Sequence, residues 1–203
     1  MARKPDLARR KEIITRTLEI LRERGVHGTT MSDLAHGLGM KRPTLYWYFK
    51  DLGEIFDAAL EEIHGRFERL FAERLAGVSH PIDVLETLLQ VSSDFHKDSR
   101  DLIILLFQLW AVGRSGDPER ILKRGREVIE PLRAELITML QSGVEAKLVA
   151  PCDPEAIVDL VLSVGDGIVV QQVTRNADLT AGVMTLRRCV LDPLRLTSET
   201  ESR

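Results

Sequence analysis

The sequence predicts an all-α fold with an N-terminal helix-turn-helix domain. Apolar side chains repeat with a period of about 3.6 residues over long stretches of the 203-residue chain, and no convincing alternating strand pattern interrupts them. Proline is absent between Pro5 and Pro43, and runs of β-branched residues are short. A composition of 44% hydrophobic and 29% charged residues is that of a globular chain with a packed core.

The first two predicted helices carry their own start and stop signals. A helix over residues 6–24 ends at Gly25, a residue type that commonly closes helices. A short helix over residues 31–38 follows Thr30, which has capping-box spacing to Asp33.

The next two predicted helices also begin at recognisable residues. Pro43 has a fixed φ that suits a first helical turn, so a second short helix is expected over residues 43–49. Asp51 then has the spacing of an N-cap for a long helix over residues 52–76.

The rest of the chain reads as further helices separated by turn signals. Pro131 lies inside one of them and should kink it or split it. Asp153 caps another, which has proline in its first turn. The expected ranges are 81–97, 99–112, 118–147, from 153 to about 176, and 180–196.

Charge is distributed unevenly and suggests two domains. Residues 1–50 hold 11 basic and 5 acidic side chains, whereas the remainder holds 17 and 26. A basic head on an acidic body favours contact between the head and a polyanion. We therefore predict two domains, over residues 1–52 and residues 53–203. A solvated charged face on the first domain is the alternative to a polyanion partner, and charge alone does not decide between them.

Four of the ten aromatic residues in the chain, Tyr46 to Phe49, are consecutive. Successive helical side chains point about 100° apart, so some of these rings must face outward. Leu45 and Phe49 are four residues apart and are expected to anchor the helix inward, leaving the other rings for a partner. A second short helix after a glycine-bearing turn enters the DNA major groove in helix-turn-helix proteins, which makes DNA the expected partner.

The expected DNA contacts lie on and around this second helix. Arg42 has the donors for a bidentate contact to a guanine edge, and the Thr44 methyl group can meet a thymine methyl. Tyr48 and Lys50 are placed to bind phosphate oxygens. The full predicted set is Thr30, Lys41, Arg42, Pro43, Thr44, Tyr46, Trp47, Tyr48 and Lys50.

These motifs resemble a known family. Gly28-Thr29-Thr30, Leu34-Ala35, Leu38-Gly39 and Thr44-Leu45-Tyr46-x-Tyr48-Phe49 resemble the DNA-binding domain of TetR-family transcriptional regulators, over about residues 8–58. The resemblance implies a cytoplasmic homodimer whose larger helical domain binds a small effector, which typically releases the protein from a palindromic DNA operator.

Two departures from the family pattern affect the DNA-binding domain. Lys41 stands where the family often has a capping serine, at an expected cost of about 1 kcal/mol. Leu52 and Gly53 stand where a phosphate-binding lysine and an acidic residue are common. One phosphate contact is then missing unless Lys50 replaces it.

The later helices carry the residues expected to bind the effector and to form the dimer. Large apolar side chains with a few polar neighbours suit a largely apolar ligand, although aromatics at helical spacing also fill ordinary cores. The expected effector residues are Phe67, Phe71, Phe95, His96, Phe107, Gln108 and Trp110. The expected dimer residues, on helices that could pair as a four-helix bundle, are Val161, Val164, Gly165, Ile168, Leu186, Val190 and Leu194.

Other classes of protein find little support. Glu61-x-x-His64 has the spacing of a di-iron bundle ligand pair but lacks a second copy, and Cys152 has no histidine nearby in sequence. We expect no enzyme activity, no cofactor or metal, and no association with a membrane. We expect the two cysteines to be unpaired thiols in a reducing compartment. An all-α small-molecule adaptor that no longer reads DNA remains the alternative.

Overall fold

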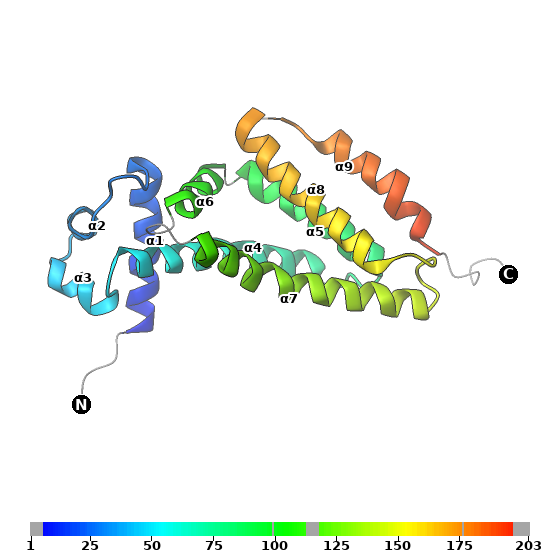
Figure 1. Ribbon diagram of the computed structural model, residues 1–203, viewed down its shortest axis with the longest axis horizontal. Coiled ribbons are helices and arrows are strands. Elements are labelled where there is room, and N and C mark those ends of the chain that lie inside the picture. The colour runs from blue at the N-terminus through cyan, green and yellow to red at the C-terminus, as the bar shows by residue number, and fades with distance from the viewer. Residues whose placement is uncertain (1–5, 99, 113–117, 176, 197–203) are drawn as a thin grey trace. The chain divides into compact units, whose positions relative to one another are not determined.

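The computed structural model describes residues 6–98, 100–112, 118–175 and 177–196, and every element in these ranges is helical except one isolated bridge. The all-α prediction is therefore confirmed for the described residues (Figure 1). Two compact units divide the chain: residues 1–66 with 101–121, and residues 67–100 with 122–203. Within the described residues, no helix combines the length and the apolar character needed to cross a membrane.

The first unit contains the three helices predicted for the head, together with parts of two helices that were expected in the second domain. They are α1 (Leu7–Arg24), α2 (Met31–Gly37), α3 (Arg42–Tyr48), the first part of α4 (Leu52–Leu75) and most of α6 (Arg100–Val112). Their apolar faces meet in a core, where the side chains of Ile13, Leu18, Leu21, Leu34, Leu45, Phe49 and Ile55 are almost fully buried.

The predicted helix ends of this unit are confirmed. Asp6 caps α1 by accepting hydrogen bonds from the N–H groups of the first turn. Thr30 and Asp33 form a complete capping box at the start of α2. Gly25 has φ of 79°, in a region that L side chains avoid and that commonly closes helices.

A close contact between α1 and α2 involves Gly37. A Cβ atom built on Gly37 would lie 2.8 Å from Cδ1 of Ile20. The two helices therefore approach closely at this point because residue 37 has no side chain.

The second unit packs four further helices around its own core. They are α5 (Pro81–Asp98), most of α7 (Pro118–Glu145), α8 (Pro154–Arg175) and α9 (Thr180–Leu186), together with the end of α4. Helix α5 packs along α8, and the two run in the same direction (Figure 1). The buried core residues include Ile82, Leu85, Leu89, Leu140, Val158, Val161, Ile168 and Leu191.

Two details of this unit concern the predicted helices. Pro131 was expected to kink or split its helix, and it does not split α7, which is one continuous helix from Pro118 to Glu145. The single helix expected over 180–196 instead changes after α9 into a π-helical turn, Arg187–Leu191, and a 3-10 turn, Asp192–Leu194. Pro193 accounts for this change, because proline cannot donate to the preceding turn and its ring clashes with the carbonyl there.

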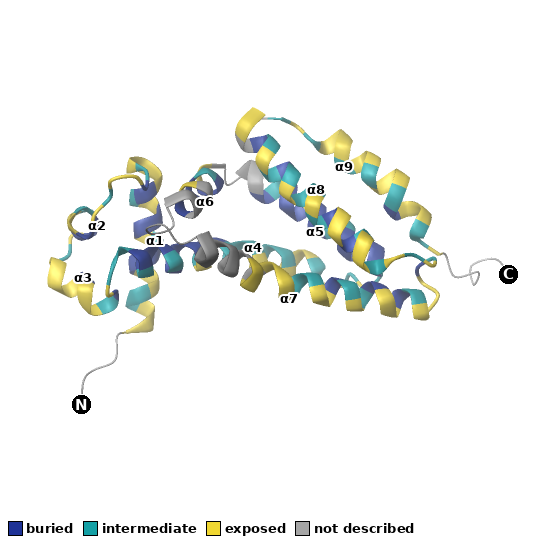
Figure 2. Ribbon diagram, viewed as in Figure 1, coloured by how far each residue is buried: buried dark blue, intermediate teal, exposed yellow. Residues whose placement is uncertain are grey.

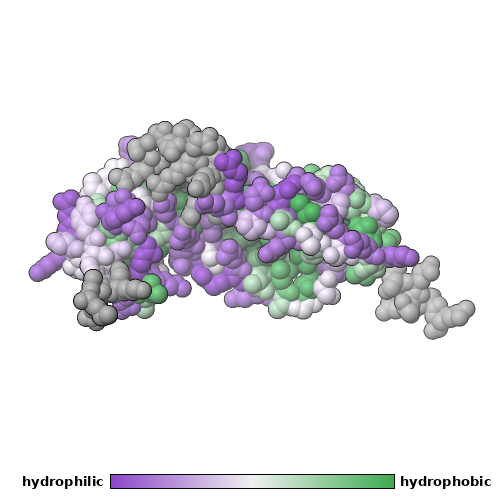
Figure 3. Space-filling model, turned by 60° about the horizontal axis from the view of Figure 1, so that its bottom comes forward, coloured by the Kyte–Doolittle hydropathy of each residue, from purple (hydrophilic) through white to green (hydrophobic). Residues whose placement is uncertain are grey.

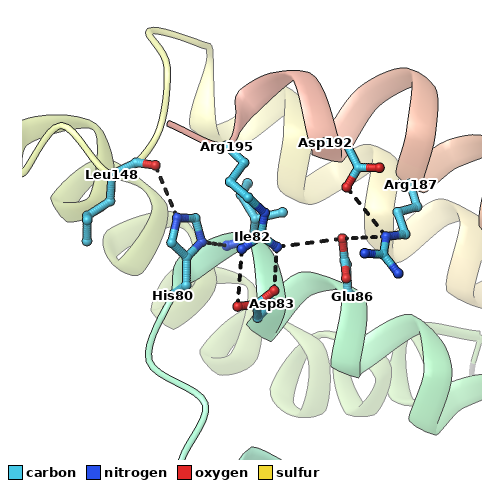
Figure 4. A network of polar contacts seen from close by, with 8 residues as sticks. All are labelled: His80, Ile82, Asp83, Glu86, Leu148, Arg187, Asp192 and Arg195. Carbon is cyan, nitrogen blue, oxygen red and sulfur yellow. Dashed lines mark hydrogen bonds and ion pairs between the residues drawn. The ribbon is translucent and has the colours of Figure 1, made fainter. Parts of the chain in front are cut away.

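A cluster of charged residues fastens this C-terminal segment to the start of α5 (Figure 4). Arg195 donates hydrogen bonds to both carboxylate oxygens of Asp83. Nε of Arg187 lies 3.1 Å from Oε1 of Glu86, without the alignment of a hydrogen bond, and 3.4 Å from Oδ1 of Asp192. The cluster therefore joins α5 to residues more than 100 positions later in the chain.

The same segment is also held by the loop before α8. The N–H of Ala150 donates to the carbonyl of Leu194, and the N–H of Leu196 donates to the carbonyl of Leu148. Nε2 of His80 lies 3.2 Å from that same Leu148 carbonyl. Backbone and side-chain contacts together fix the end of the described chain.

Candidate nucleic-acid interface

Helices α2 and α3 form a helix-turn-helix. Helix α2 packs on α3, and the turn between them is closed by hydrogen bonds from the N–H of Gly39 to the carbonyl of His36 and from the N–H of Met40 to the carbonyl of Ala35. Ala35 and Leu45 are buried, and the small Ala35 side chain allows the helices to approach closely. The turn thus holds α3 at a fixed angle to α2.

The four consecutive aromatic residues divide into inward and outward side chains, as predicted. Phe49 is fully buried, whereas Tyr46 and Trp47 are 40% and 46% exposed. Figure 2 shows most of α3 in the colour of exposed residues. Trp47 and Tyr48 pack edge to face, with ring centroids 4.7 Å apart. Because Leu45 and Phe49 anchor the helix, the outward rings are free to contact a partner molecule.

Three residues, Arg10, Phe49 and Glu54, stabilise the junction between α3 and α4, and we call this cluster the bracket. The Arg10 guanidinium lies 4.5 Å from the centre of the Phe49 ring and donates a hydrogen bond to Glu54. Glu54 also accepts a hydrogen bond of 2.9 Å from the backbone N–H of Lys50. Sequence reasoning missed this bracket, because Arg10 and Glu54 are 44 residues apart.

Several basic residues of the head have partners within the first unit. Arg10 pairs with Glu54, Arg16 donates to the carbonyl of Leu38, and Arg22 pairs with Asp101. Lys41 and Lys50, by contrast, are exposed at the two ends of α3. Exposed ammonium groups at these positions are available to bind phosphate oxygens.

The departures noted in the sequence have clear structural positions. Lys41 is the N-cap of α3 and makes no side-chain capping hydrogen bond. Gly53 is buried at the start of α4, and Leu52 is partly buried beside it. Neither residue supplies a charged side chain at the start of α4.

Thr30 has a structural role that is visible at the start of α2. Its hydroxyl accepts a hydrogen bond from the Asp33 N–H, and Asp33 accepts one from the Thr30 N–H. Hydrogen bonds from Thr30 lower the pKa of the Asp33 carboxyl.

Pro43 and Thr44 are exposed on α3, so the whole predicted DNA-contact set lies on or beside the helix-turn-helix.

Replacing Thr30 with alanine is expected to lower the free energy of unfolding by about 1 kcal/mol. The threonine hydroxyl accepts a hydrogen bond from the Asp33 N–H and donates one to the Asp33 carboxylate, and both are lost. Urea denaturation of the variant, with Thr30→Ser as a control that keeps the hydroxyl, measures this cost. Equal stability of Thr30→Ala and the unmodified chain would show that the capping box contributes nothing.

The predicted effector residues are brought together only in part. Phe67 packs against Phe71 and Phe95 in the second unit, with ring centroids 6.4 Å and 5.6 Å away. Gln108 belongs to the first unit, where its side-chain oxygen accepts a hydrogen bond from the Val26 N–H. The side chains of His96, Phe107 and Trp110 lie outside those that the structure describes.

The predicted dimer residues fall into two groups. Val161 and Ile168 are buried in the core of the chain itself, which leaves little of either side chain for a partner. The others are partly buried: Val164, Gly165, Leu186, Val190 and Leu194. Among the side chains that the structure describes on α8 and α9, the large apolar ones that are exposed are Leu160, Val170 and Met184, which sequence reasoning did not name. An apolar α8 without a polar face was the signal that could have indicated them.

Helices α2 and α3 and the exposed face of α3 have the arrangement of a helix-turn-helix domain. Residues 13–60 match the family model described as bacterial regulatory proteins, tetR family. These residues therefore match the TetR family of bacterial regulatory proteins, as the motifs indicated.

Sequence relatives match the head. The chain is 42% identical over 57 residues to the class D tetracycline repressor protein of Escherichia coli, an alignment that covers 28% of this chain and 26% of that protein. The chain thus spans about a quarter of the length of the curated tetracycline repressors that it matches.

Solved structures match the fold over nearly the whole chain. A TetR transcription regulator from Haloarcula marismortui superposes with a TM-score of 0.77 at 20% identity, covering 93% of this chain and 99% of the other. The transcriptional regulator FadR from Bacillus subtilis, solved in complex with stearoyl-CoA, superposes with a TM-score of 0.72 at 18% identity, covering 91% and 99%. At these identities the likeness establishes the fold.

Proposed function

We propose that the chain is a homodimeric repressor that binds a palindromic DNA operator and is released from it by a small, largely apolar effector. The observation that carries the DNA-binding part is the division of α3: Leu45 and Phe49 are buried, while Lys41, Arg42 and the Tyr46 and Trp47 rings are exposed. Such a helix presents donors and apolar groups to base edges from a rigid support.

The aromatic cluster supports an apolar effector. Phe67, Phe71 and Phe95 gather in the second unit, and Phe67 and Phe71 are only partly buried. Aromatic side chains of this kind line sites for apolar ligands. The Bacillus subtilis regulator of the same fold is described with stearoyl-CoA, so molecules with a long acyl chain are the first effectors to test.

The exposed apolar side chains of α8 and α9 support a dimer. Figure 3 turns the lower side of Figure 1 forward, and on that side hydrophobic surface is visible over the second unit as well. Leu160, Val170 and Met184 can pair with their copies across a two-fold axis, as in a four-helix bundle. Sedimentation of the chain as a monomer at micromolar concentration would contradict this assembly.

DNA binding is tested most directly with the whole chain at low salt. Retention on calf-thymus DNA at about 50 mM salt, lost as salt rises, is the expected result, because phosphate contacts dominate non-specific binding. Absence of binding at that salt would favour the second candidate, a small-molecule adaptor whose helix-turn-helix no longer reads DNA. The buried Gly53 and the uncharged Leu52 at the start of α4 are the observations that favour this candidate.

Replacing Lys50 with alanine is expected to weaken operator binding and to reduce its salt dependence, since Lys50 is expected to replace the lysine missing at the start of α4. The slope of log affinity against log salt should fall by about 1 per subunit. Arg188→Ala, which removes an exposed positive charge from the second unit, is the control. An unchanged slope for Lys50→Ala would mean that Lys50 contacts no phosphate.

A further inference from the structure

Arg42 and Tyr46 form a pair on the exposed face of α3. Nη2 of Arg42 donates a hydrogen bond of 3.3 Å to the Tyr46 hydroxyl. The guanidinium carbon also lies 5.5 Å from the centre of the Tyr46 ring, within the range of a cation–π contact. The two residues are four positions apart, so one helical turn brings their side chains together.

The pair is distinct from the other aromatic contacts of the helix. Phe49 is buried against Arg10, and Trp47 packs on Tyr48. Tyr46 is thus the ring that contacts the arginine expected to read bases. Its exposed fraction of 40% leaves the pair open to a partner molecule.

The geometry has a consequence for recognition of a base. An arginine side chain has many rotamers, and holding it in one of them for a bidentate contact costs conformational entropy. The guanidinium has five N–H donors, of which one is engaged by Tyr46. The remaining donors include enough to bind both N7 and O6 of a guanine, the acceptor pair that arginine matches in the major groove.

We infer that Tyr46 is a positioning residue that holds the Arg42 guanidinium ready to read a guanine in each half of the operator. This role rests on the proposed DNA-binding function. In this role the Tyr46 hydroxyl orients the Arg42 side chain, and Tyr46 itself does not contact a base. The specificity of the protein at one base pair then depends on two side chains.

Selection of bound sequences from a random DNA pool tests the inference with the full chain and two variants. The unmodified chain should enrich a palindrome with a guanine at one fixed position in each half-site. Arg42→Gln should lose that guanine and favour adenine, which glutamine matches. Arg188→Gln, the same substitution on the exposed surface of the second unit, should enrich the original palindrome.

Tyr46→Phe separates positioning from general affinity, because phenylalanine keeps the ring and removes only the hydroxyl. The preference for the selected operator over one with the guanine changed to adenine should fall by about threefold, as expected for one lost hydrogen bond. The slope of affinity against salt should stay the same, since no phosphate contact is lost. Equal thermal midpoints for the variant and the unmodified chain exclude a folding defect.

The outcomes are distinguishable. If the unmodified chain enriches a palindrome while Arg42→Gln enriches the same bases, or while Tyr46→Phe keeps the full guanine preference, the positioning role is overturned and the DNA-binding function stands. If the unmodified chain enriches no sequence, both the proposed function and this inference are overturned.

Discussion

Replacing Phe49 with alanine is expected to lower the free energy of unfolding by about 3–5 kcal/mol and to abolish DNA binding. Phe49 is fully buried at the end of α3, so its removal leaves a cavity that the surrounding helices fill only in part. The Arg10 guanidinium loses the ring on which it lies, and the bracket with Glu54 is weakened. Helix α3 then has only Leu45 to anchor it.

The neighbouring Trp47 provides a matched control. Trp47→Ala removes a larger side chain from the same helix, but one that is 46% exposed, and should change the free energy of unfolding by less than about 1 kcal/mol. Urea denaturation of both variants, followed by circular dichroism, gives the comparison. Equal costs for the two substitutions would contradict the division of the aromatic residues into inward and outward side chains.

Asp83→Asn and Glu86→Gln are expected to change stability in opposite directions at neutral pH. The hydrogen bond from Arg195 lowers the pKa of the Asp83 carboxyl, whereas burial raises the pKa of the Glu86 carboxyl against the opposing effect of Arg187. Asp83→Asn should cost about 1–2 kcal/mol, since a partly exposed bidentate contact is lost. Glu86→Gln should be neutral or stabilise by up to about 1 kcal/mol, because a buried charge is removed.

The two carboxyls also give opposite pH dependences. The pKa of Asp83 is lower in the folded chain, so the ionised carboxylate stabilises the fold. This stabilisation is present above the pKa of the unfolded chain and is lost as pH falls through the pKa of the folded chain. The pKa of Glu86 is higher in the folded chain, so the protonated carboxyl stabilises the fold. This stabilisation is present below the pKa of the unfolded chain and is lost as pH rises through the pKa of the folded chain.

Denaturation of the unmodified chain and of both variants between pH 3 and pH 8 measures these slopes, a range of about the spread that carboxyl pKa values cover in proteins. Glu86 makes the unmodified chain less stable as pH rises, and Glu86→Gln should abolish this effect. Asp83 makes the unmodified chain more stable as pH rises, and Asp83→Asn should abolish that effect. A large loss of stability in Glu86→Gln at pH 7 would show instead that the ionised Glu86 is needed by Arg187 and Arg195.

The head was predictable from the sequence because its signals are local. The Thr30–Asp33 capping box and the closing Gly25 each act within a few residues of a helix end, and the structure has both as expected. The inward and outward positions of Leu45 and Trp47 follow from the helical period alone. Short-range rules of this kind need no knowledge of the tertiary fold.

The second unit was less predictable because its features depend on residues far apart in sequence. The cluster of Asp83 and Arg195 joins positions 112 residues apart, and no local pattern indicates such a pair. Helix α8 is apolar on most of its faces, so the sequence did not tell the buried Val161 from the exposed Leu160. The predicted boundary at residue 52, and the effector and dimer contacts, stay predictions.

The close approach of α1 and α2 at Gly37 has an evolutionary consequence. A Cβ atom at position 37 would lie 2.8 Å from Cδ1 of Ile20, so a side chain there requires that terminal methyl group to rotate away, a shorter side chain at position 20, or a small shift of α2. Positions 20 and 37 are therefore expected to vary together among descendants of this chain, with alanine at 37 arising beside valine at 20. A side chain at position 37 that left Ile20 in place would shift α2, on which α3 packs.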